Sequence, residues 1–117
     1  GARVLVIRAA AGSKVWSAGH DIDEIPEPRR DPLGYFDPLE TLLRKVQDCP
    51  VPVIAMVEGS VWGGACDLCC SCDIVIAAQG ATFAMTPAKI GIPYNASGVV
   101  HFTNLLGVNK AKEMFFT

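Results

Sequence analysis

Residues 53–78 read VIAMVEGSVWGGACDLCCSCDIVIAA, and this stretch gives the clearest indication of the fold class. The β-branched run at its start, 53–58, predicts a strand, and a similar run at 73–78 predicts another. Between them a Gly-Gly pair opens a predicted helix that ends at Cys72. Because strand, helix and strand follow one another, the stretch indicates parallel strands joined by a crossover in an α/β fold.

The sequence on either side extends this pattern. Residues 3–9 form another short β-branched run, which predicts a buried strand closed by a turn. Four prolines make residues 26–38 a loop. Apolar positions at helical spacing then predict a helix over 38–48, and two more helices are expected over 97–106 and 109–116.

Length and composition exclude several classes of protein. The chain has 117 residues, half of them hydrophobic and only 19% charged, which fits one ordered domain rather than a disordered tail. Ten Lys and Arg against 12 Asp and Glu give a net charge of −2, which argues against nucleic acid as a partner. No apolar run approaches the roughly 20 residues that span a membrane. We therefore expect a soluble, cytoplasmic protein.

The charges are spread unevenly. Residues 59–101 contain only Asp67, Asp73 and Lys89 as charged side chains, so we expect this stretch to be interior. A chain of this size has limited room to bury such a stretch, which predicts burial in a larger assembly. The chain also starts at Gly1 directly before an apolar run, with no initiator Met. We expect it to be a piece of something longer.

Two glycine-containing loops follow predicted strands and precede helices, at 17–21 and 59–64. The start of a helix has unpaired N–H donors and a partial positive charge, so two such loops side by side could stabilise an oxyanion. Neither loop fits a nucleotide phosphate-binding motif. The alternative is that the glycines only permit tight turns.

Four of the five cysteines lie within seven residues, at positions 66, 69, 70 and 72. Zinc is one interpretation, but four thiolates on a single helix cannot easily surround a tetrahedral ion, and no second group of ligands follows. Free cysteine also packs as a small hydrophobic residue. We therefore favour core packing and expect no metal.

Three ionisable side chains stand out from their apolar neighbours. Asp67 lies inside the predicted cysteine-rich helix, where a buried carboxylate either joins a polar network or serves as an acid or base. His20 lies in the first glycine loop, where its backbone can matter more than its imidazole. His101, on an apolar helix, is expected to be a packed core residue.

Two short loops interrupt the apolar region, Thr86-Pro87 and Ile92-Pro93-Tyr94-Asn95. Tyr94 follows a proline and could present its phenol to a pocket, where a hydroxyl can orient a carboxylate or a water. The alternative is a buried tyrosine that only satisfies its own hydroxyl.

Taken together, these motifs resemble the crotonase (enoyl-CoA hydratase/isomerase) superfamily over nearly the whole chain. The resemblance rests on six segments: Ser17-Ala18-Gly19-His20-Asp21-Ile22, Val57–Ala65, Cys72–Ala77, Ala81–Met85, Met85-Thr86-Pro87 and Ile92-Pro93-Tyr94-Asn95. It implies a crotonase-like ββα superhelix. It also implies that residues 1–117 are the central part of an acyl-CoA-binding catalytic domain, with N-terminal strands and C-terminal helices absent.

The resemblance also implies roles for individual residues. The backbone N–H groups of His20 and Gly64 would form an oxyanion hole around the thioester oxygen of a CoA ester. Thr86 would line the acyl pocket, and Tyr94 would position a malonyl-type carboxylate or the enolate. Asp67 falls where hydratases carry one of two catalytic glutamates. Further substrate-binding positions, which would meet the CoA moiety largely through main-chain groups, are Ala18, Asp21, Ile22, Asp23 and Glu24.

The second glutamate position is occupied by Pro87, which has no acid. Hydration of an enoyl thioester needs paired carboxylates to activate water, whereas decarboxylation does not. The resemblance therefore implies decarboxylation of a malonyl-type CoA thioester, methylmalonyl-CoA giving propionyl-CoA and CO2. It implies no separate cofactor, and a homo-oligomer, trimer or hexamer, for the full-length protein. The alternatives are an enoyl-CoA hydratase or isomerase, and a cysteine-rich metal-binding or non-catalytic interaction module.

Overall fold

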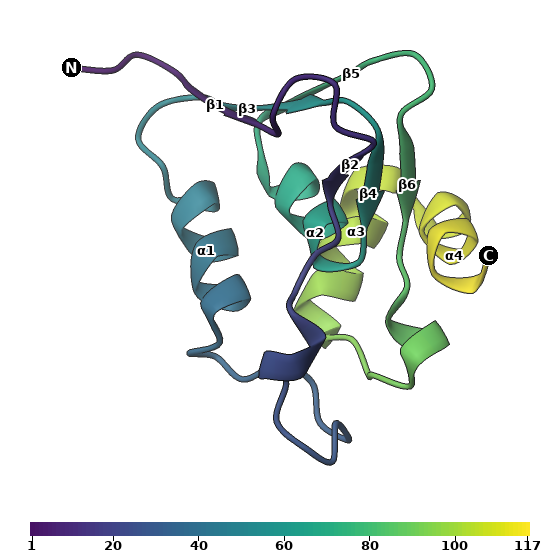
Figure 1. The fold of residues 1–117 in the computed structure, drawn as a ribbon. Coiled ribbons are helices and arrows are strands. Elements are labelled where there is room, and N and C mark those ends of the chain that lie inside the picture. Colours follow the sequence, from purple (N-terminus) through teal and green to yellow (C-terminus); the bar gives the residue numbers. More distant parts are fainter.

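The computed structural model describes all residues 1–117 and contains two parallel sheets of three strands each (Figure 1). The first sheet has the order β1-β3-β5 and the second the order β2-β4-β6. The strands of the first sheet are β1 (Leu5–Arg8), β3 (Val53–Val57) and β5 (Ile74–Ala77). Those of the second are β2 (Val15–Ser17), β4 (Ser60–Trp62) and β6 (Thr82–Ala84).

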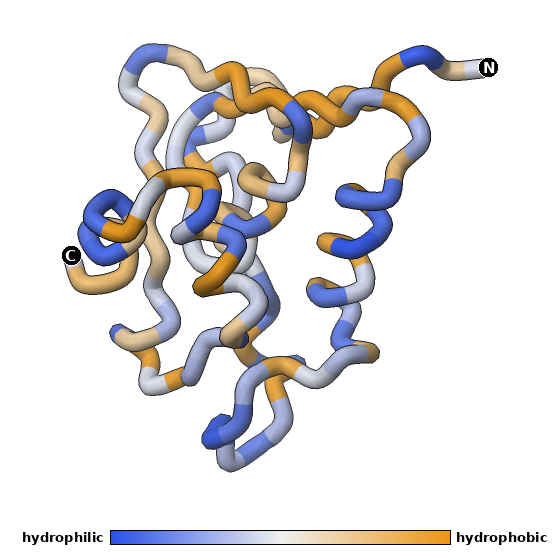
Figure 2. The backbone as a smooth tube through the Cα atoms, turned by 180° about the vertical axis from the view of Figure 1, so that it is seen from behind, coloured by the Kyte–Doolittle hydropathy of each residue, from blue (hydrophilic) through white to orange (hydrophobic).

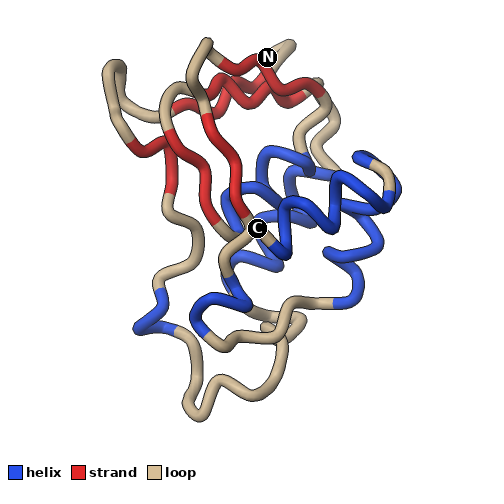
Figure 3. Tube along the Cα trace, turned by 90° about the vertical axis from the view of Figure 1, so that its right-hand side faces the viewer, coloured by secondary structure: helices blue, strands red, loops and turns tan.

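The helices separate successive pairs of strands. After β1 and β2 come the short 3-10 helix η1 (Ile22–Glu24) and α1 (Pro38–Gln47), and after β3 and β4 comes α2 (Gly64–Ser71). After β5 and β6 come η2 (Pro87–Ile90), α3 (Ala96–Leu106) and α4 (Val108–Phe116). The chain thus repeats strand, strand, helix three times, which confirms the expected ββα superhelix. In Figure 3 the strands gather on one side and the helices pack beside them.

The strands of the first sheet and all four α-helices match the elements predicted from the sequence. The second sheet was not predicted. Its strands have three residues each, too few to show an alternating pattern, and β4 lies inside what reads as a glycine loop.

Helix α2 lies at the centre of the core. Most of its residues are buried, and it contacts α1, α3 and β4. The core combines side chains of α2 with side chains from both sheets, from the residue after β6 and from the last two helices: Trp16, Ala55, Val57, Val61, Ala65, Cys66, Cys69, Met85, Phe102 and Ala111. The first turn of α2 is therefore held from several sides.

The burial expected for the apolar stretch 59–101 and for the strands is only partly correct. Helix α2 is buried, but all four residues of β5 are exposed, with Ile76 at 57%. In β1, Leu5 and Val6 are each 46% exposed. Both strands flank β3 and have a single neighbouring strand, so only β3 places alternate side chains fully inside. Figure 2 shows the hydrophobic character of this first sheet.

No helix combines the length and apolar character needed to cross a membrane.

Candidate functional site

The two glycine loops are in direct contact. A β-carbon built on Gly19 would lie 3.0 Å from the backbone nitrogen of Gly64 and 2.7 Å from the carbonyl oxygen of Trp62. Gly19 also has a φ of +90°, in the region that side chains disfavour. Both the space and the conformation therefore require glycine, and the first loop passes directly against the start of α2.

This contact brings two backbone donors to the same place. The N–H of His20 has no acceptor within the chain. Gly64 is the first residue of α2, so its N–H has no acceptor inside the helix. The partial positive charge of a helix N-terminus adds to the attraction that such donors exert on an anion.

Both residues line a cavity of about 330 Å³. Six of the residues predicted for the site line it: Ala18, His20, Ile22, Gly64, Thr86 and Tyr94. Its remaining lining is largely apolar, and it contains no Asp, Glu, Lys or Arg side chain. The volume lies in the range typical of small-molecule sites.

Three of the predicted binding residues lie beside the cavity and do not line it. Asp21, Asp23 and Glu24 are exposed on η1 and the residue before it. The Asp21 carboxylate accepts a hydrogen bond from the Asp23 N–H at 3.0 Å and so caps this short helix.

Asp67 also lies outside the cavity. It is 3% exposed, and its carboxylate accepts a hydrogen bond from the Tyr94 hydroxyl. On its other side the Nδ1 atom of His101 lies 3.3 Å from Asp67 Oδ1. Asp67 and His101 border a second, larger cavity of about 680 Å³, whereas Tyr94 borders the first. The network interpretation of Asp67 is therefore the one that the geometry supports.

The expectation for His101 is wrong. Its side chain is 27% exposed and pairs with Asp67 instead of packing in the core. The reason is the buried carboxylate, which needs polar partners and finds one on the next helix. The neighbouring Phe102 occupies the core position.

Tyr94 is held closely against α3 and α4. Its ring packs edge-on against Phe102 and Phe115. A β-carbon on Gly98 would lie 3.1 Å from Asp67 Oδ2 and would collide with the Tyr94 ring, so this glycine makes room for both side chains. Burial, followed by the charge of Asp67, raises the pKa of the Tyr94 phenol. The phenol therefore stays protonated, with its proton directed at Asp67.

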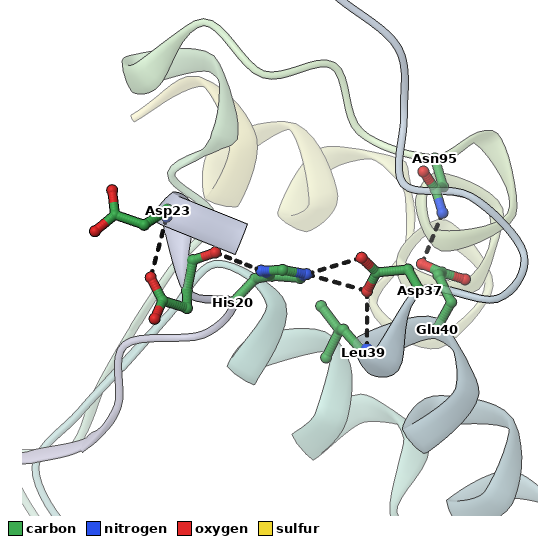
Figure 4. Close-up of polar contacts among 7 residues, drawn as sticks. His20, Asp23, Asp37, Leu39, Glu40 and Asn95 are labelled. Carbon is green, nitrogen blue, oxygen red and sulfur yellow. Dashed lines mark hydrogen bonds and ion pairs between the residues drawn. The ribbon is translucent and has the colours of Figure 1, made fainter. Parts of the chain in front are cut away.

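The side chain of His20 points toward Asp37 at the start of α1 (Figure 4). Its Nδ1 lies 2.7 Å from the carbonyl oxygen of Asp21, and its Nε2 lies 2.9 Å from a carboxylate oxygen of Asp37. Burial alone would lower the pKa of His20, but the hydrogen bonds to Asp37 and Asp21 and the charge of Asp37 outweigh it and raise that pKa.

The start of α1 contributes functional candidates that the sequence analysis did not name. Asp37 caps the helix and holds His20, while the Glu40 carboxylate accepts a hydrogen bond from Asn95 at 2.6 Å. Leu39 lines the cavity. Asp followed by Pro is a recognisable signal for a helix start. It identifies the cap, but not the contact of Asp37 with a loop 17 residues away.

The four clustered cysteines, at positions 66, 69, 70 and 72, pack in or against the core, as expected. Cys66 and Cys69 are almost fully buried, and burial raises the pKa of each thiol to about 12. No group of three or more His, Cys, Asp or Glu side chains is arranged to hold a metal ion.

The model of the family described as "Enoyl-CoA hydratase/isomerase" matches residues 1–117. The chain belongs to this family. Among curated members, the chain is 51% identical over 115 residues to methylmalonyl-CoA decarboxylase of Escherichia coli K12, covering 98% of the chain and 44% of that enzyme. It is 35% identical over 113 residues to the short-chain-enoyl-CoA hydratase of Clostridium acetobutylicum, covering 96% of the chain and 43% of the hydratase.

Solved structures of this enoyl-CoA hydratase/isomerase family share its fold. Methylmalonyl-CoA decarboxylase complexed with 2S-carboxypropyl-CoA superposes with a TM-score of 0.92 at 51% identity, covering 97% of the chain and 44% of that structure. The complex with 2-nitronate-propionyl-CoA gives the same values. These matches establish the crotonase fold. The chain spans less than half the length of the relatives it matches.

Proposed function

We propose that the protein containing this chain decarboxylates a malonyl-type CoA thioester, converting methylmalonyl-CoA to propionyl-CoA and CO2. One observation carries the choice of reaction. The cavity beside the two backbone donors has no carboxylate side chain, and Pro87 is part of its lining. Water addition needs a carboxylate that can activate the water, whereas loss of CO2 does not.

The two donors would stabilise the charge that forms in the reaction. As the bond between the α-carbon and the carboxylate breaks, its electron pair passes into the thioester and gives an enolate with charge on oxygen. The backbone N–H groups of His20 and Gly64 would donate to this oxygen as an oxyanion hole. One such donor contributes about 3 kcal/mol to a transition state. A proton taken up from solvent then adds to the α-carbon and converts the enolate to propionyl-CoA.

The surroundings of the cavity favour loss of the carboxylate charge. No Lys or Arg lines the cavity to stabilise a carboxylate. Tyr94 directs its proton at Asp67, and the Asp67 carboxylate lies behind it. A substrate carboxylate placed beside Tyr94 would thus be less stable than neutral CO2, which lowers the barrier to its departure.

Other residues would hold the substrate. Thr86 and Ala18 would line the acyl site, and residues 20–24 would meet the CoA moiety along the exposed loop, chiefly through main-chain groups. Residues 1–117 would be the central part of the catalytic domain, acting without a separate cofactor because CoA enters with the substrate. We propose a cytoplasmic homo-oligomer, trimer or hexamer, for the whole protein, which light scattering of the full-length protein tests.

The direct test is an activity screen of the full-length protein containing this chain. It would be incubated with methylmalonyl-CoA and, separately, with crotonyl-CoA, and the products followed by mass spectrometry. Release of propionyl-CoA supports the proposal. Water addition to crotonyl-CoA without release of CO2 from methylmalonyl-CoA would replace it with the hydratase alternative, to which the similarity to a short-chain-enoyl-CoA hydratase also points.

The variant Asp67→Asn separates the two reactions further. If Asp67 acts as the acid or base of a hydratase, the variant loses that activity. If the protein is a decarboxylase, the variant keeps part of its activity, because Asp67 lies behind Tyr94 and outside the cavity.

A further inference from the structure

The position of the His20 ring between two acceptors fixes its charge. The Asp21 carbonyl on one side and the Asp37 carboxylate on the other can only accept hydrogen bonds, and they lie 2.7 Å and 2.9 Å from the two ring nitrogens. Both nitrogens must therefore carry a proton for both contacts to form. The geometry corresponds to an imidazolium ring, paired with a carboxylate whose side chain is only 10% exposed.

Asp37 has a second task at the same place. Its Oδ1 atom accepts a hydrogen bond from the Leu39 N–H at 2.8 Å and so caps α1. One carboxylate therefore ties the His20 loop to the first turn of α1. Figure 4 shows both contacts meeting at Asp37.

The same turn of α1 reaches the second donor. The Leu39 side chain packs against Gly64, so closely that a β-carbon there would collide with the Leu39 Cδ2 atom. Gly19, beside His20, lies against the Gly64 nitrogen. The start of α1 thus contacts both residues that carry the candidate oxyanion donors, His20 through Asp37 and Gly64 through Leu39.

We propose that Asp37 is a positioning residue that fixes the spacing of the two backbone donors by holding the charged ring of His20 against the start of α1. This role rests on the proposed oxyanion hole. Asp37 touches no reacting atom and acts through the loop that carries the His20 N–H. A loose loop would place that donor poorly, and small misplacements in an active site have large effects on rate.

Few other charges face the ring, so its protonation depends mainly on Asp37. Glu24 of η1 is the other charged group that acts on it, α1 contributes Asp37, and α2 contributes no charged group at this contact. The Tyr94 phenol is the only other titratable group that lines the cavity. Activity is therefore expected to fall as the pH rises and the ring loses its proton.

The test uses Asp37→Asn in the full-length protein. Asparagine caps helices as well as aspartate does, so the helix start is kept while the charge is removed. We expect kcat in the alkaline range to fall about tenfold and the alkaline limb of the kcat profile to move to lower pH, with KM little changed. The matched control is Asp31→Asn, the same change at an exposed residue in the preceding loop, which should leave the profile in place.

Two further measurements keep the outcome clear. The ring proton signals of His20, followed by NMR against pH, should titrate at lower pH in Asp37→Asn than in the unchanged protein, whether or not methylmalonyl-CoA is the substrate. If the protein hydrates crotonyl-CoA instead, the kcat profile is recorded for that reaction, and failure of the proposed function is thereby separated from failure of this inference. An unchanged pH profile, or a lowered unfolding temperature without a shifted profile, would reduce Asp37 to a helix cap and overturn the proposal.

Discussion

The molecule contains two histidine–aspartate pairs, and they are built in opposite ways. In the pair of His20 and Asp37 both side chains are about nine-tenths buried, and the histidine is held at both ring nitrogens. In the pair of His101 and Asp67 the aspartate is buried while the histidine is 27% exposed, and the distance is longer, at 3.3 Å. The first pair holds a loop, and the second supports a tyrosine. The same two residue types therefore have different roles, which depend on the further groups that each pair contacts: the Asp21 carbonyl and the Leu39 N–H in the first pair, and the Tyr94 hydroxyl in the second.

The largest effect is expected from removing the buried carboxylate of the second pair. Asp67→Ala leaves the Tyr94 hydroxyl and the His101 ring without their acceptor in the interior, which should lower the free energy of unfolding by about 3 kcal/mol. Urea unfolding of the full-length protein measures this. Asp31→Ala, at an exposed aspartate, is the control. Equal losses in the two variants would mean that the buried carboxylate gives no net stabilisation.

The next effect concerns the tyrosine that only the second pair supports. Tyr94→Phe removes the hydroxyl that donates to Asp67, so a buried carboxylate beside the cavity loses a partner and the site is held less firmly. This should lower kcat about 10- to 100-fold while KM changes little. Steady-state kinetics of CO2 release checks this. Tyr35→Phe, at the only other tyrosine, which is 67% exposed, should behave like the unchanged protein. If kcat/KM and substrate binding fall equally, Tyr94 is a binding or packing residue.

A smaller effect distinguishes the first pair by its pH dependence. The pKa of His20 is raised in the folded protein, so its pairing stabilises the fold fully below the ordinary histidine pKa and loses this contribution as pH rises through the folded value. The stability difference between the unchanged protein and Asp37→Asn should therefore shrink as the pH rises above the ordinary histidine pKa of about 6.5. Urea midpoints at several pH values measure it. A difference that stays constant over these pH values would assign the whole effect to capping of α1.

The smallest effect is expected at the partly exposed histidine. His101→Asn keeps a hydrogen-bond donor near Asp67 and alters only a partly exposed contact of 3.3 Å, so the free energy of unfolding should change by about 1 kcal/mol or less. Thermal unfolding is sufficient to measure this. If the free energy of unfolding falls as much as in Asp67→Ala, His101 contributes as much to stability as the buried carboxylate does.

Sequence patterns predicted the first sheet because its strands lie in β-branched runs, and the helices because they show apolar spacing or begin at glycine or proline. They also identified the loops of His20 and Gly64, together with Thr86 and Tyr94, and these four residues line one cavity. The second sheet could not be predicted because its strands have three residues each, too few to show an alternating pattern. These strands are defined by their pairing with one another.

The partners of these residues could not be predicted in the same way. The contact of Asp37 with His20 depends on how α1 packs, and nothing local to either residue specifies it. The exposure of His101 likewise depends on Asp67, which lies 34 positions away. Patterns along the chain locate residues on elements, whereas such contacts arise only when the elements pack.

The thiols of α2 have a consequence for measuring motion in the protein. Cys66 and Cys69 flank Asp67 on the helix that begins with Gly64, and both are almost inaccessible to solvent. With the pKa of each thiol raised to about 12, neither forms a reactive thiolate while the helix stays packed. The rate at which an alkylating reagent labels them would therefore measure how often this helix detaches from the core. These two thiols thus report local opening of the helix that begins with Gly64.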